Sequence, residues 1–320
     1  MQGVTGSSPV VSTKDSSTHC IYGVELFLHE NNTKKGAFMA NLRIMSNNIW
    51  ACDVNNEHWA KIGMDCSAKN RAPGFVRLYL ETNPDIIGLQ ECTAKCADYI
   101  MQGLRENNAN YALLWGRDTP IIYKTDKFEL IDSKYCIYNE DIPNLEGSFN
   151  NVQTKSYCIA VFRLKENGKL IIFATTHLWW KSSDPSTDYY QPFSDEARTY
   201  QLNFLMDETE KFQKKYNCPI IMVGDLNSLY CSEAVQSALK RGYFHAYNIA
   251  TDYKDETDGQ HYCYADGYDM NENPKTFDES IDHILIKNAP DNFVKRFERY
   301  APEYYMPLSD HFPVWIDTEI

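Results

Sequence analysis

Short apolar runs that stop at a polar residue recur along this chain of 320 residues and constrain its fold more than any other feature. The run Pro219–Val223 leads into Asp225 and Asn227, and the run Leu170–Ala174 leads into His177. Continuous apolar runs of this length are typical of strands that are buried on both faces of a sheet. The chain is therefore expected to fold around covered sheets, with polar groups collected at the strand ends.

The segment after the first run places a carboxylate close to a carboxamide. Side chains alternate along an extended chain, so Asp225 and Asn227, two positions apart, point the same way. Such a pair suits chemistry at a phosphate, where one group activates water and another donates hydrogen bonds to the developing negative charge. A Gly-Asp-Leu-Asn segment is also an ordinary turn after a strand, so these residues alone leave both interpretations open.

Five other strand ends or strand starts carry polar groups of the kind that act on phosphates. They are Asn48, Glu91, His177, Asp282 with His283, and Asp310 with His311. Buried strands account for the apolar runs but not for polar ends of this composition. A rigid sheet directs side chains from its rim, so the recurrence favours one shared site over isolated turns.

The composition argues against a membrane-spanning protein, a protein that binds long nucleic acids tightly and a structural zinc protein. With 43% apolar residues the chain can bury a large core, and no apolar run approaches the roughly 20 residues of a membrane span. The net charge of −13, with scattered Lys and Arg, argues against tight binding to long nucleic acids. The ten cysteines lack the two close pairs of a zinc site, and the N-terminus lacks a secretory signal pattern. Reduced thiols and a cytoplasmic location are expected.

The N-terminal segment differs from the rest, because it is rich in Ser, Thr, Val and Gly without an apolar period. We expect residues 1–38 to lie outside the fold as a non-domain extension and residues 39–320 to form the domain. A sharper hypothesis is that translation of a bacterial gene starts at Met39, because the codons of residues 34–36 permit a purine-rich ribosome-binding sequence. A natively produced protein that starts at Met1 would contradict it.

Strands and helices are expected to alternate from residue 40 onward. Asn167 and Gly168 separate two apolar runs, which is the strongest short signal for a β-hairpin. Strands alternating with helices but including a hairpin indicate a mixed sheet and not a parallel barrel. The predicted elements are strands over 42–49, 85–90, 157–164 and 170–176, helices over 74–82 and 94–107, and two helices capped by Ser194 and Ser232.

Taken in order, these motifs resemble the endonuclease/exonuclease/phosphatase superfamily of DNase I-like, metal-dependent phosphoesterases over nearly all of residues 39–320. The resemblance implies an α/β fold, a four-layer α/β/β/α sandwich with two packed mixed β-sheets, and a site at one rim. It also implies in-line attack of water on a phosphoester, with Mg²⁺ or Mn²⁺ as the cofactor. The motifs that carry it are Asn48, Gln90-Glu91, Thr176-His177, Gly224–Asn227, Ile281–His283 and Ser309–His311.

Chemistry and the resemblance together suggest roles for the metal-binding and water-activating groups. Glu91 is expected to bind the cation, because hard cations prefer carboxylate oxygen. Asp310 is expected to share the metal, and Asn48 to assist it or to hold a phosphate oxygen. Asp225 is expected to orient and deprotonate water, and Asn227 to steady the transition state.

Two histidines are expected to contact the scissile phosphate. His311 would do so with its ring oriented by Asp282, since a carboxylate on one ring nitrogen leaves the other directed at the substrate. His177 would be the second donor. His283 stays outside the catalytic set, because several relatives carry Arg or Tyr at that place.

The sequence constrains the substrate less than the reaction. Trp179 and Trp180 follow His177, and their rings would stack on a base or a sugar, or equally pack inside a lid. An acidic, Tyr-rich insertion over 252–278 would repel a polyanion if it borders the site. A small or short-chain phosphoester is the first expectation, an endo- or exonuclease acting on DNA or RNA is the alternative, and a non-catalytic binding module of the same fold comes third.

Overall fold

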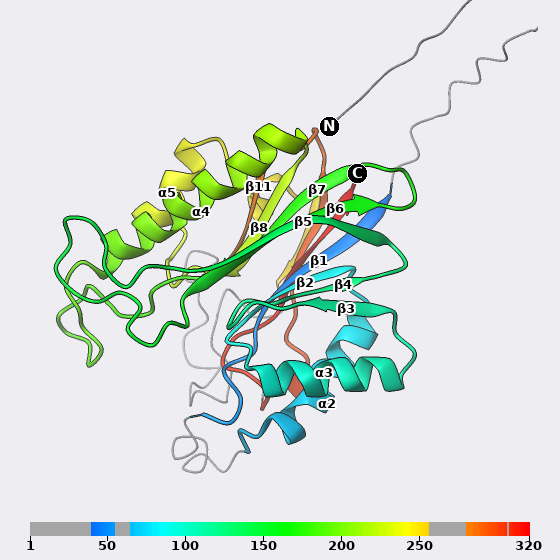
Figure 1. Ribbon diagram of the computed structural model, residues 1–320, viewed down its shortest axis with the longest axis horizontal. Helices are drawn as coiled ribbons and strands as arrows, with labels where there is room; N and C mark the ends of the chain where they lie inside the picture. The colour runs from blue at the N-terminus through cyan, green and yellow to red at the C-terminus, as the bar shows by residue number, and fades with distance from the viewer. Residues whose placement is uncertain (1–39, 55–64, 256–279, 306) are drawn as a thin grey trace, which may run out of the picture. The chain divides into compact units, whose positions relative to one another are not determined.

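The computed structural model describes residues 40–54, 65–255, 280–305 and 307–320. Two β-sheets pack face to face within one compact unit, Phe38–Ile320, and helices cover their outer faces (Figure 1). The hypotheses about residues 1–38 and about translation from Met39 concern residues outside this description, and they stay predictions.

The first sheet has seven strands. In chain order they are β1 (Asn41–Asn48), β2 (Ile86–Gln90), β3 (Tyr111–Leu114), β4 (Ile121–Lys124), β10 (Asp252–Asp255), β12 (Val294–Arg299) and β13 (Val314–Glu319). Their order across the sheet is β10-β12-β13-β1-β2-β4-β3. β1 runs parallel to β2 and β10 runs parallel to β12, whereas β13 is antiparallel to β1.

The second sheet has six strands in the order β5-β6-β7-β8-β11-β9. In chain order they are β5 (Phe128–Ile137), β6 (Ser156–Leu164), β7 (Leu170–His177), β8 (Ile220–Asp225), β9 (Phe244–His245) and β11 (Asp282–Lys287). β7 and β8 are parallel, and β11 is antiparallel to β8. Both sheets are therefore mixed, as the sequence predicts.

Two pairs of helices complete the layers. α2 (Ala68–Thr82) and α3 (Ala94–Glu106) cover the first sheet, and α4 (Ser194–Tyr216) and α5 (Glu233–Lys240) cover the second (Figure 1). Two short elements are α6 (Ala246–Ile249) and the 3₁₀ turn η3 (Glu303–Tyr305). The predicted α/β/β/α sandwich is confirmed.

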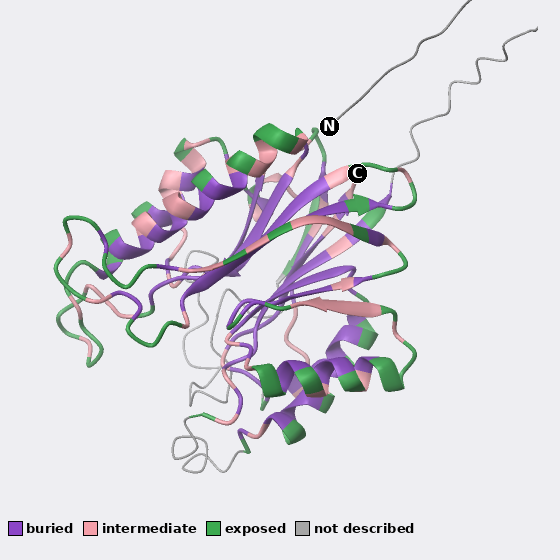
Figure 2. Ribbon diagram, in the orientation of Figure 1, coloured by how far each residue is buried: buried purple, intermediate pink, exposed green. Residues whose placement is uncertain are grey.

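The alternation of side chains along β8 shows how one strand serves two apolar layers. Ile221 and Val223 pack between the two sheets, whereas Ile220 and Met222 pack against the helices of the second sheet. Such a strand is buried on both faces, which explains why its sequence is continuously apolar. Figure 2 shows the buried strands running through the centre, with exposed residues concentrated on the outer helices and loops.

Two helix starts differ from the expectations. α2 begins at Ala68, not at residue 74, because the Ser67 side chain caps it and the helix accommodates Pro73. At α4 the N-cap is Phe193, with φ 64°, and Ser194 is the first helical residue. Ser194 Oγ donates to the Gln191 carbonyl over 2.8 Å instead of capping the helix.

The predicted β-hairpin is confirmed, and the predicted insertion is described only in part. The hairpin of β6 and β7 is present, and Gly168 in its turn has φ +76°. Within the insertion predicted over 252–278, Asp252–Asp255 is β10 at the edge of the first sheet, and residues 256–278 lie outside the described part. In the described ranges, no helix combines the length and apolar character needed to cross a membrane.

Candidate active site

The polar strand ends converge because of strand direction. β1 and β2 are parallel and finish together, so Asn48 lies opposite Gln90, next to Glu91. β7 and β8 also finish together, so His177 lies opposite Asp225. β11 and β13 run the other way, and their starting ends meet the same rim with Asp282 and with the segment that contains His311.

Gly224 allows the two parallel strands of the second sheet to approach closely at this rim. It has φ +156°, and a Cβ added there would collide with the carbonyl oxygen of Thr176 on β7. A glycine before Asp225 is therefore required by the backbone packing. The close approach places His177 Nε2 3.4 Å from Asp225 Oδ2.

Asn48 connects the two carboxylates of the site across the sheets. Its Nδ2 donates to Asp225 Oδ2 over 2.9 Å and lies 3.4 Å from Glu91 Oε1. Its Oδ1 accepts from the Trp50 backbone N–H over 2.9 Å, and Glu91 Oε2 accepts from the Ala51 N–H over 3.1 Å. Both carboxylates are thus fixed by donors, and Asn48 presents its amide nitrogen to them.

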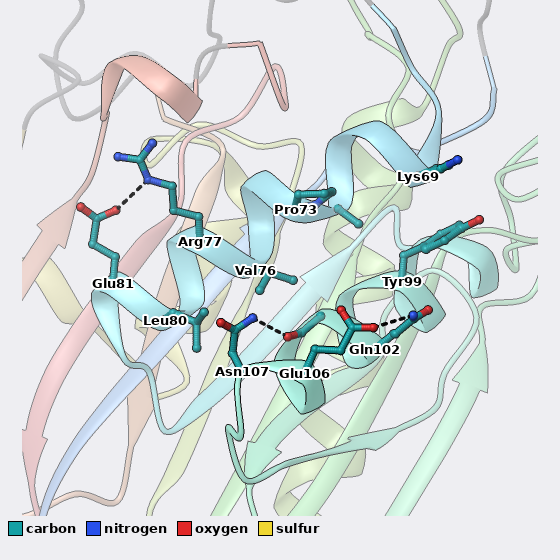
Figure 3. Close-up of a pocket in the computed structure, with 12 residues that line it drawn as sticks. Lys69, Pro73, Val76, Arg77, Leu80, Glu81, Tyr99, Gln102, Glu106 and Asn107 are labelled. Atoms are coloured by element: carbon teal, nitrogen blue, oxygen red, sulfur yellow. Dashed lines mark hydrogen bonds and ion pairs between the residues drawn. The ribbon is translucent and has the colours of Figure 1, made fainter.

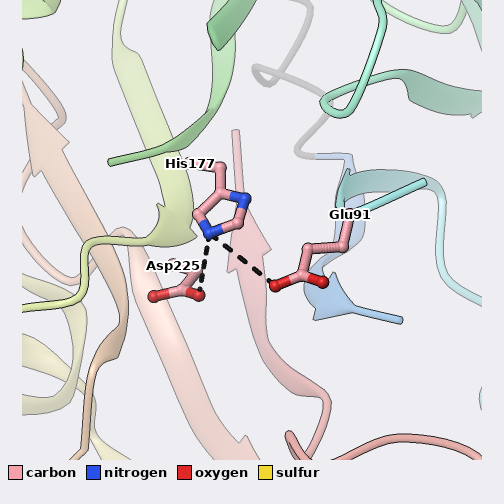
Figure 4. Close-up of side chains that lie close together, drawn as sticks. All are labelled: Glu91, His177 and Asp225. Atoms are coloured by element: carbon pink, nitrogen blue, oxygen red, sulfur yellow. Dashed lines mark ion pairs between the residues drawn. The ribbon is translucent and has the colours of Figure 1, made fainter. Parts of the chain in front are cut away.

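His177 lies between these carboxylates and a third acidic residue. Its Nδ1 donates to Asp118 Oδ2 over 2.8 Å, which leaves Nε2 directed at Asp225 and at Glu91 Oε1, 3.9 Å away (Figure 4). The buried Lys155 approaches the same ring, with its Nζ 3.2 Å from Nδ1 and 2.5 Å from Nε2.

His311 approaches the same oxygen of Asp225 as His177 does. Its Nδ1 donates to Asp282 Oδ2 over 2.7 Å, the pairing expected from the sequence. Its Nε2 lies 3.8 Å from Asp225 Oδ2 and 4.0 Å from Asp310 Oδ1. Two histidines, each oriented by its own carboxylate, therefore lie next to Asp225.

Burial raises the pKa values of Asp225 and Glu91, and the neighbouring positive charges lower them. Burial opposes ionisation of Asp225, but the charges of His311, His177 and Lys155 outweigh it and lower the pKa of Asp225. For Glu91 the opposing charges of His177 and Lys155 likewise outweigh burial and lower its pKa. These carboxylates are therefore ionised at neutral pH.

In the pair formed by His311 and Asp282, both pKa values are raised, unlike those of Asp225 and Glu91. Burial alone would lower the pKa of His311, but Asp282, Asp310 and Asp225 surround the ring and raise its pKa well above the usual value. Burial raises the pKa of Asp282. A protonated His311 carries a hydrogen on Nε2, so it can donate to an anion in the pocket.

Asn227 completes the turn after β8. Its backbone has φ 46°, its N–H donates to Asp225 Oδ1 over 2.9 Å, and its Nδ2 donates to the Leu178 carbonyl over 3.1 Å. The turn that left two interpretations open is therefore a real turn, and it also belongs to the cluster. The segment serves both purposes at once.

A pocket of about 570 Å³ opens over these groups. Trp180, which is 45% exposed, and Tyr189 form one wall, with ring centroids 6.0 Å apart. Trp179 does not line it, because its ring is buried against Phe149 and only 1% exposed. The pocket is lined by Trp50, Ala51, Glu91, Asp118, Thr154, Lys155, His177, Trp180, Tyr189, Asp225, Asn227, Ile281, Asp310 and His311.

A larger hollow, of about 700 Å³, lies between α2 and α3 (Figure 3). Val76 and Leu80 line it together with polar groups that already pair with one another, such as Gln102 with Glu106 over 2.7 Å. It contains no cluster of acidic and histidine side chains within the described residues. The chemistry of the molecule is therefore concentrated at the smaller pocket.

The donor atoms at the rim fit a small divalent cation. Glu91, His177 and Asp225 each offer a ligand atom, and these atoms lie within 4.8 Å of one another. Two ionised carboxylates are the ligands that hard cations such as Mg²⁺ and Mn²⁺ prefer. Asp310 lines the same pocket, whereas the Asn48 oxygen is directed to the Trp50 N–H.

Asp118 and Lys155 were not anticipated from the sequence. Asp118 lies in the loop before β4, and Lys155 directly precedes β6. Neither follows an apolar run that ends in a recognisable motif. Only the pairing of β6 with β7, which sets Ser156 opposite His177, brings Lys155 to the rim.

Known proteins share both the sequence pattern and the fold. The sequence profile described as the Endonuclease/Exonuclease/phosphatase family matches residues 48–311. No curated protein matches the sequence significantly. Among solved structures, a family protein from Bacteroides thetaiotaomicron superposes with TM-score 0.68 at 18% identity, covering 88% of this chain and 99% of that chain.

Two further similar structures are those of a phosphatase and of a protein bound to DNA. A mannosyl-6-phosphatase from Bacteroides thetaiotaomicron has TM-score 0.66 at 21% identity, over 87% of this chain and 99% of that chain. TDP2 from D. rerio, complexed with a single-strand DNA product, has TM-score 0.57 at 18% identity, over 87% of this chain and 98% of that chain. The structural likeness establishes the fold, and the profile match over most of the chain shows that this protein belongs to the endonuclease/exonuclease/phosphatase family.

Proposed function

We propose that this protein is a Mg²⁺- or Mn²⁺-dependent hydrolase of small or short-chain phosphoesters. The observation that carries the proposal is the arrangement around Asp225. Asn48 joins this ionised carboxylate to Glu91, and two carboxylate-oriented histidines, His177 and His311, lie 3.4 and 3.8 Å from its Oδ2. Anionic and cationic groups thus meet in one pocket large enough for a small substrate.

Glu91 is proposed to hold the divalent cation, with a contribution from Asp310, which lines the same pocket. When bound, the cation supplies Lewis-acid polarisation of a phosphate oxygen and partial neutralisation of its charge. Asn48 keeps Glu91 and Asp225 in place, because its single amide group reaches both carboxylates. In this role Asn48 orients the metal-binding carboxylate from behind, because it is buried and does not line the pocket.

Asp225 is proposed to orient an attacking water molecule and accept its proton. Its lowered pKa keeps it ionised at neutral pH, and hydrogen bonds from Asn48 and from the Asn227 N–H fix both oxygens. A general base must be present in its unprotonated form and be correctly oriented, and both conditions are met.

Donors around the base are proposed to stabilise the negative charge that develops on phosphate. The raised pKa of His311 keeps a hydrogen on its Nε2, and the ammonium of Lys155 lies beside His177 on the other wall. The Asn227 amide adds a neutral donor at the turn. Preorganised donors of this kind commonly contribute the largest part of catalysis.

The pocket wall formed by Trp180 and Tyr189 is proposed to bind the rest of the substrate. Exposed aromatic faces stack on sugars and on bases, and both rings are nearly half exposed. The net charge of −13 disfavours long polyanions. The structural likeness to a mannosyl-6-phosphatase from Bacteroides thetaiotaomicron supports the proposal of a small phosphorylated substrate.

A nuclease remains the alternative function. The likeness to TDP2 in complex with a single-strand DNA product supports it, and the same aromatic wall would stack on bases. The two functions differ in the length of the substrate, so a matched substrate panel separates them.

The test compares phosphate release and oligonucleotide cleavage by wild-type protein and by Asp225→Asn. Substrates are sugar monophosphates, nucleotides and a single-stranded oligonucleotide, each with Mg²⁺, with Mn²⁺ and with EDTA. Asp132→Asn, which alters a carboxylate paired with Lys215 on the surface, is the matched control. We expect metal-dependent hydrolysis of a small substrate that Asp225→Asn reduces at least about a hundredfold. Cleavage of the oligonucleotide alone would favour the nuclease.

A further inference from the structure

Two buried histidines outside the proposed catalytic set lie next to the turn that carries Asn227. His283 follows Asp282 on β11, so the two side chains point to opposite faces of the sheet. His283 Nε2 lies 2.7 Å from the carbonyl oxygen of Ser228, and its Nδ1 lies 2.9 Å from His245 Nε2. Both imidazole rings are 1% exposed.

The acceptor at one end fixes the direction of every hydrogen bond in this chain. A carbonyl oxygen only accepts, so His283 must carry its hydrogen on Nε2. A neutral imidazole has one N–H, and Nδ1 of His283 therefore accepts from the Nε2–H of His245. The remaining His245 Nδ1 accepts from the backbone N–H of Tyr247 over 3.3 Å.

Burial favours the neutral form that this pattern requires. It lowers the pKa of His283 to about 4 and, with the neighbouring His283, lowers the pKa of His245 well below its usual value. The charge of the buried Arg299 acts in the same direction on both rings. The geometry and the environment are consistent with a single pair of tautomers.

The carbonyl held by His283 belongs to a turn with a left-handed backbone conformation. Asn227 has φ 46°, in the region that glycine, Asn and Asp adopt more readily than other residues. Asp225 and Leu178 hold this turn on the pocket side. His283 holds it from behind, at the residue directly after Asn227.

We propose that His283 is a positioning residue, which fixes the Ser228 carbonyl and thereby directs the Asn227 amide into the pocket, and that His245 holds the ring by donating to its Nδ1. The inference rests on the function proposed above, because it assigns to the turn the role of Asn227 in the transition state. His283 itself contacts neither substrate nor metal. Its effect on turnover passes through Asn227.

The first test is a double-mutant cycle between His283→Phe and Asn227→Ala, measured as kcat and KM. His283→Phe keeps an aromatic ring, a slightly larger one, and removes the donor, so we expect kcat to fall by about ten- to a hundredfold with KM nearly unchanged. In the Asn227→Ala background the same change should cost less than about twofold, since residues that act as a unit are not additive. A full multiplicative loss in that background would overturn the inference.

Two further variants separate positioning from general stability. His283→Gln keeps an N–H donor and should recover part of the lost kcat, whereas Ile172→Ala, in the apolar layer beneath α4, should lower stability but not kcat of the folded protein. Failure of His283→Gln to exceed His283→Phe would contradict the role of the donor. Full activity of Asn227→Ala would instead refute the proposed function of the turn, so the two failures are distinguishable.

A second measurement does not depend on activity. The ¹⁵N chemical shifts of the two imidazoles in metal-free protein at neutral pH report their tautomers directly. We expect the Nε2–H tautomer for both His283 and His245, and His283 should keep it in His245→Phe, because the Ser228 carbonyl remains its acceptor. An Nδ1–H tautomer or a protonated ring at His283 would overturn the proposal.

Discussion

Asn48 donates its side-chain amide to Asp225, which lies 177 positions later in the sequence and in the opposite sheet. The same amide reaches Glu91, so one neutral group is placed between two ionised carboxylates. Without a donor or a cation, two such carboxylates in a buried pocket would repel one another. The position of Asn48 therefore explains how the rim stays assembled before a cation binds.

Replacing Asn48 tests this relationship. Asn48→Ala removes the shared donor, so we expect the free energy of unfolding in EDTA to fall by about 1–3 kcal/mol, and kcat to fall as Asp225 loses its orientation. Urea denaturation with and without Mg²⁺ measures the first effect. Asn107→Ala, which removes an exposed amide bonded to the Gly103 carbonyl of α3, serves as a control with a smaller loss. Equal losses in both variants would argue against a special role for Asn48.

Asp282→Asn should alter the charge of His311. The amide keeps an acceptor oxygen but removes the negative charge that is the main cause raising the pKa of His311. That pKa should fall, and the cationic donor should be lost at lower pH than in wild type. We expect the alkaline limb of the pH–rate profile to move to lower pH, and an NMR titration of His311 in metal-free protein to move with it. An unmoved limb would contradict the assignment of His311 as a charged donor.

His283 should make stability depend on pH. Its pKa of about 4 in the folded protein lies below the usual 6.5, so the unfolded chain binds the proton more readily. The stabilisation is complete above about pH 6.5 and is lost as the pH falls towards 4, a difference of about 3 kcal/mol for this residue. The free energy of unfolding of wild type, measured in EDTA across this range, should fall more steeply than that of His283→Gln. Parallel curves would disprove the prediction.

Substitution of two adjacent tryptophans by alanine should affect KM in one case and stability in the other. Trp180→Ala removes an exposed ring from the pocket wall, so KM should rise by about five- to tenfold with little change in kcat or stability. Trp179→Ala removes a buried ring packed against Phe149 and should lower the free energy of unfolding by about 3–5 kcal/mol. Steady-state kinetics and urea denaturation of both variants provide the comparison. If KM rises in neither variant, the aromatic wall does not bind the substrate.

Most residues of the candidate site could be located from the sequence because they stand at strand ends, and the structure brings them together. Apolar runs locate the strands, and the parallel pairing of β7 with β8 then brings His177 and Asp225 together. The assignment of both tryptophans to the substrate could not be refined from the sequence, because neighbouring residues on an extended segment face opposite ways. The structure buries Trp179 and exposes Trp180.

The sequence does not reveal contacts between residues that are far apart in the chain, because these contacts depend on how the strands pair. Asp118 meets His177 from 59 positions away, and His245 meets His283 from 38 positions away. No local pattern marks either pairing. The start of α2 is missed for a different reason, because Pro73 reads as a helix boundary but is accommodated within the helix.

The most direct test of the central claim is the rate of Mg²⁺-dependent phosphate release by wild type and by Asp225→Asn on the best small substrate of the panel. The substitution keeps the size of the side chain and removes the base, and its single amide oxygen can accept from Asn48 or from the Asn227 N–H. The account predicts a loss of at least about a hundredfold in kcat, with both proteins equally folded. Equal turnover by Asp225→Asn, or turnover by wild type that is unaffected by EDTA, would contradict it.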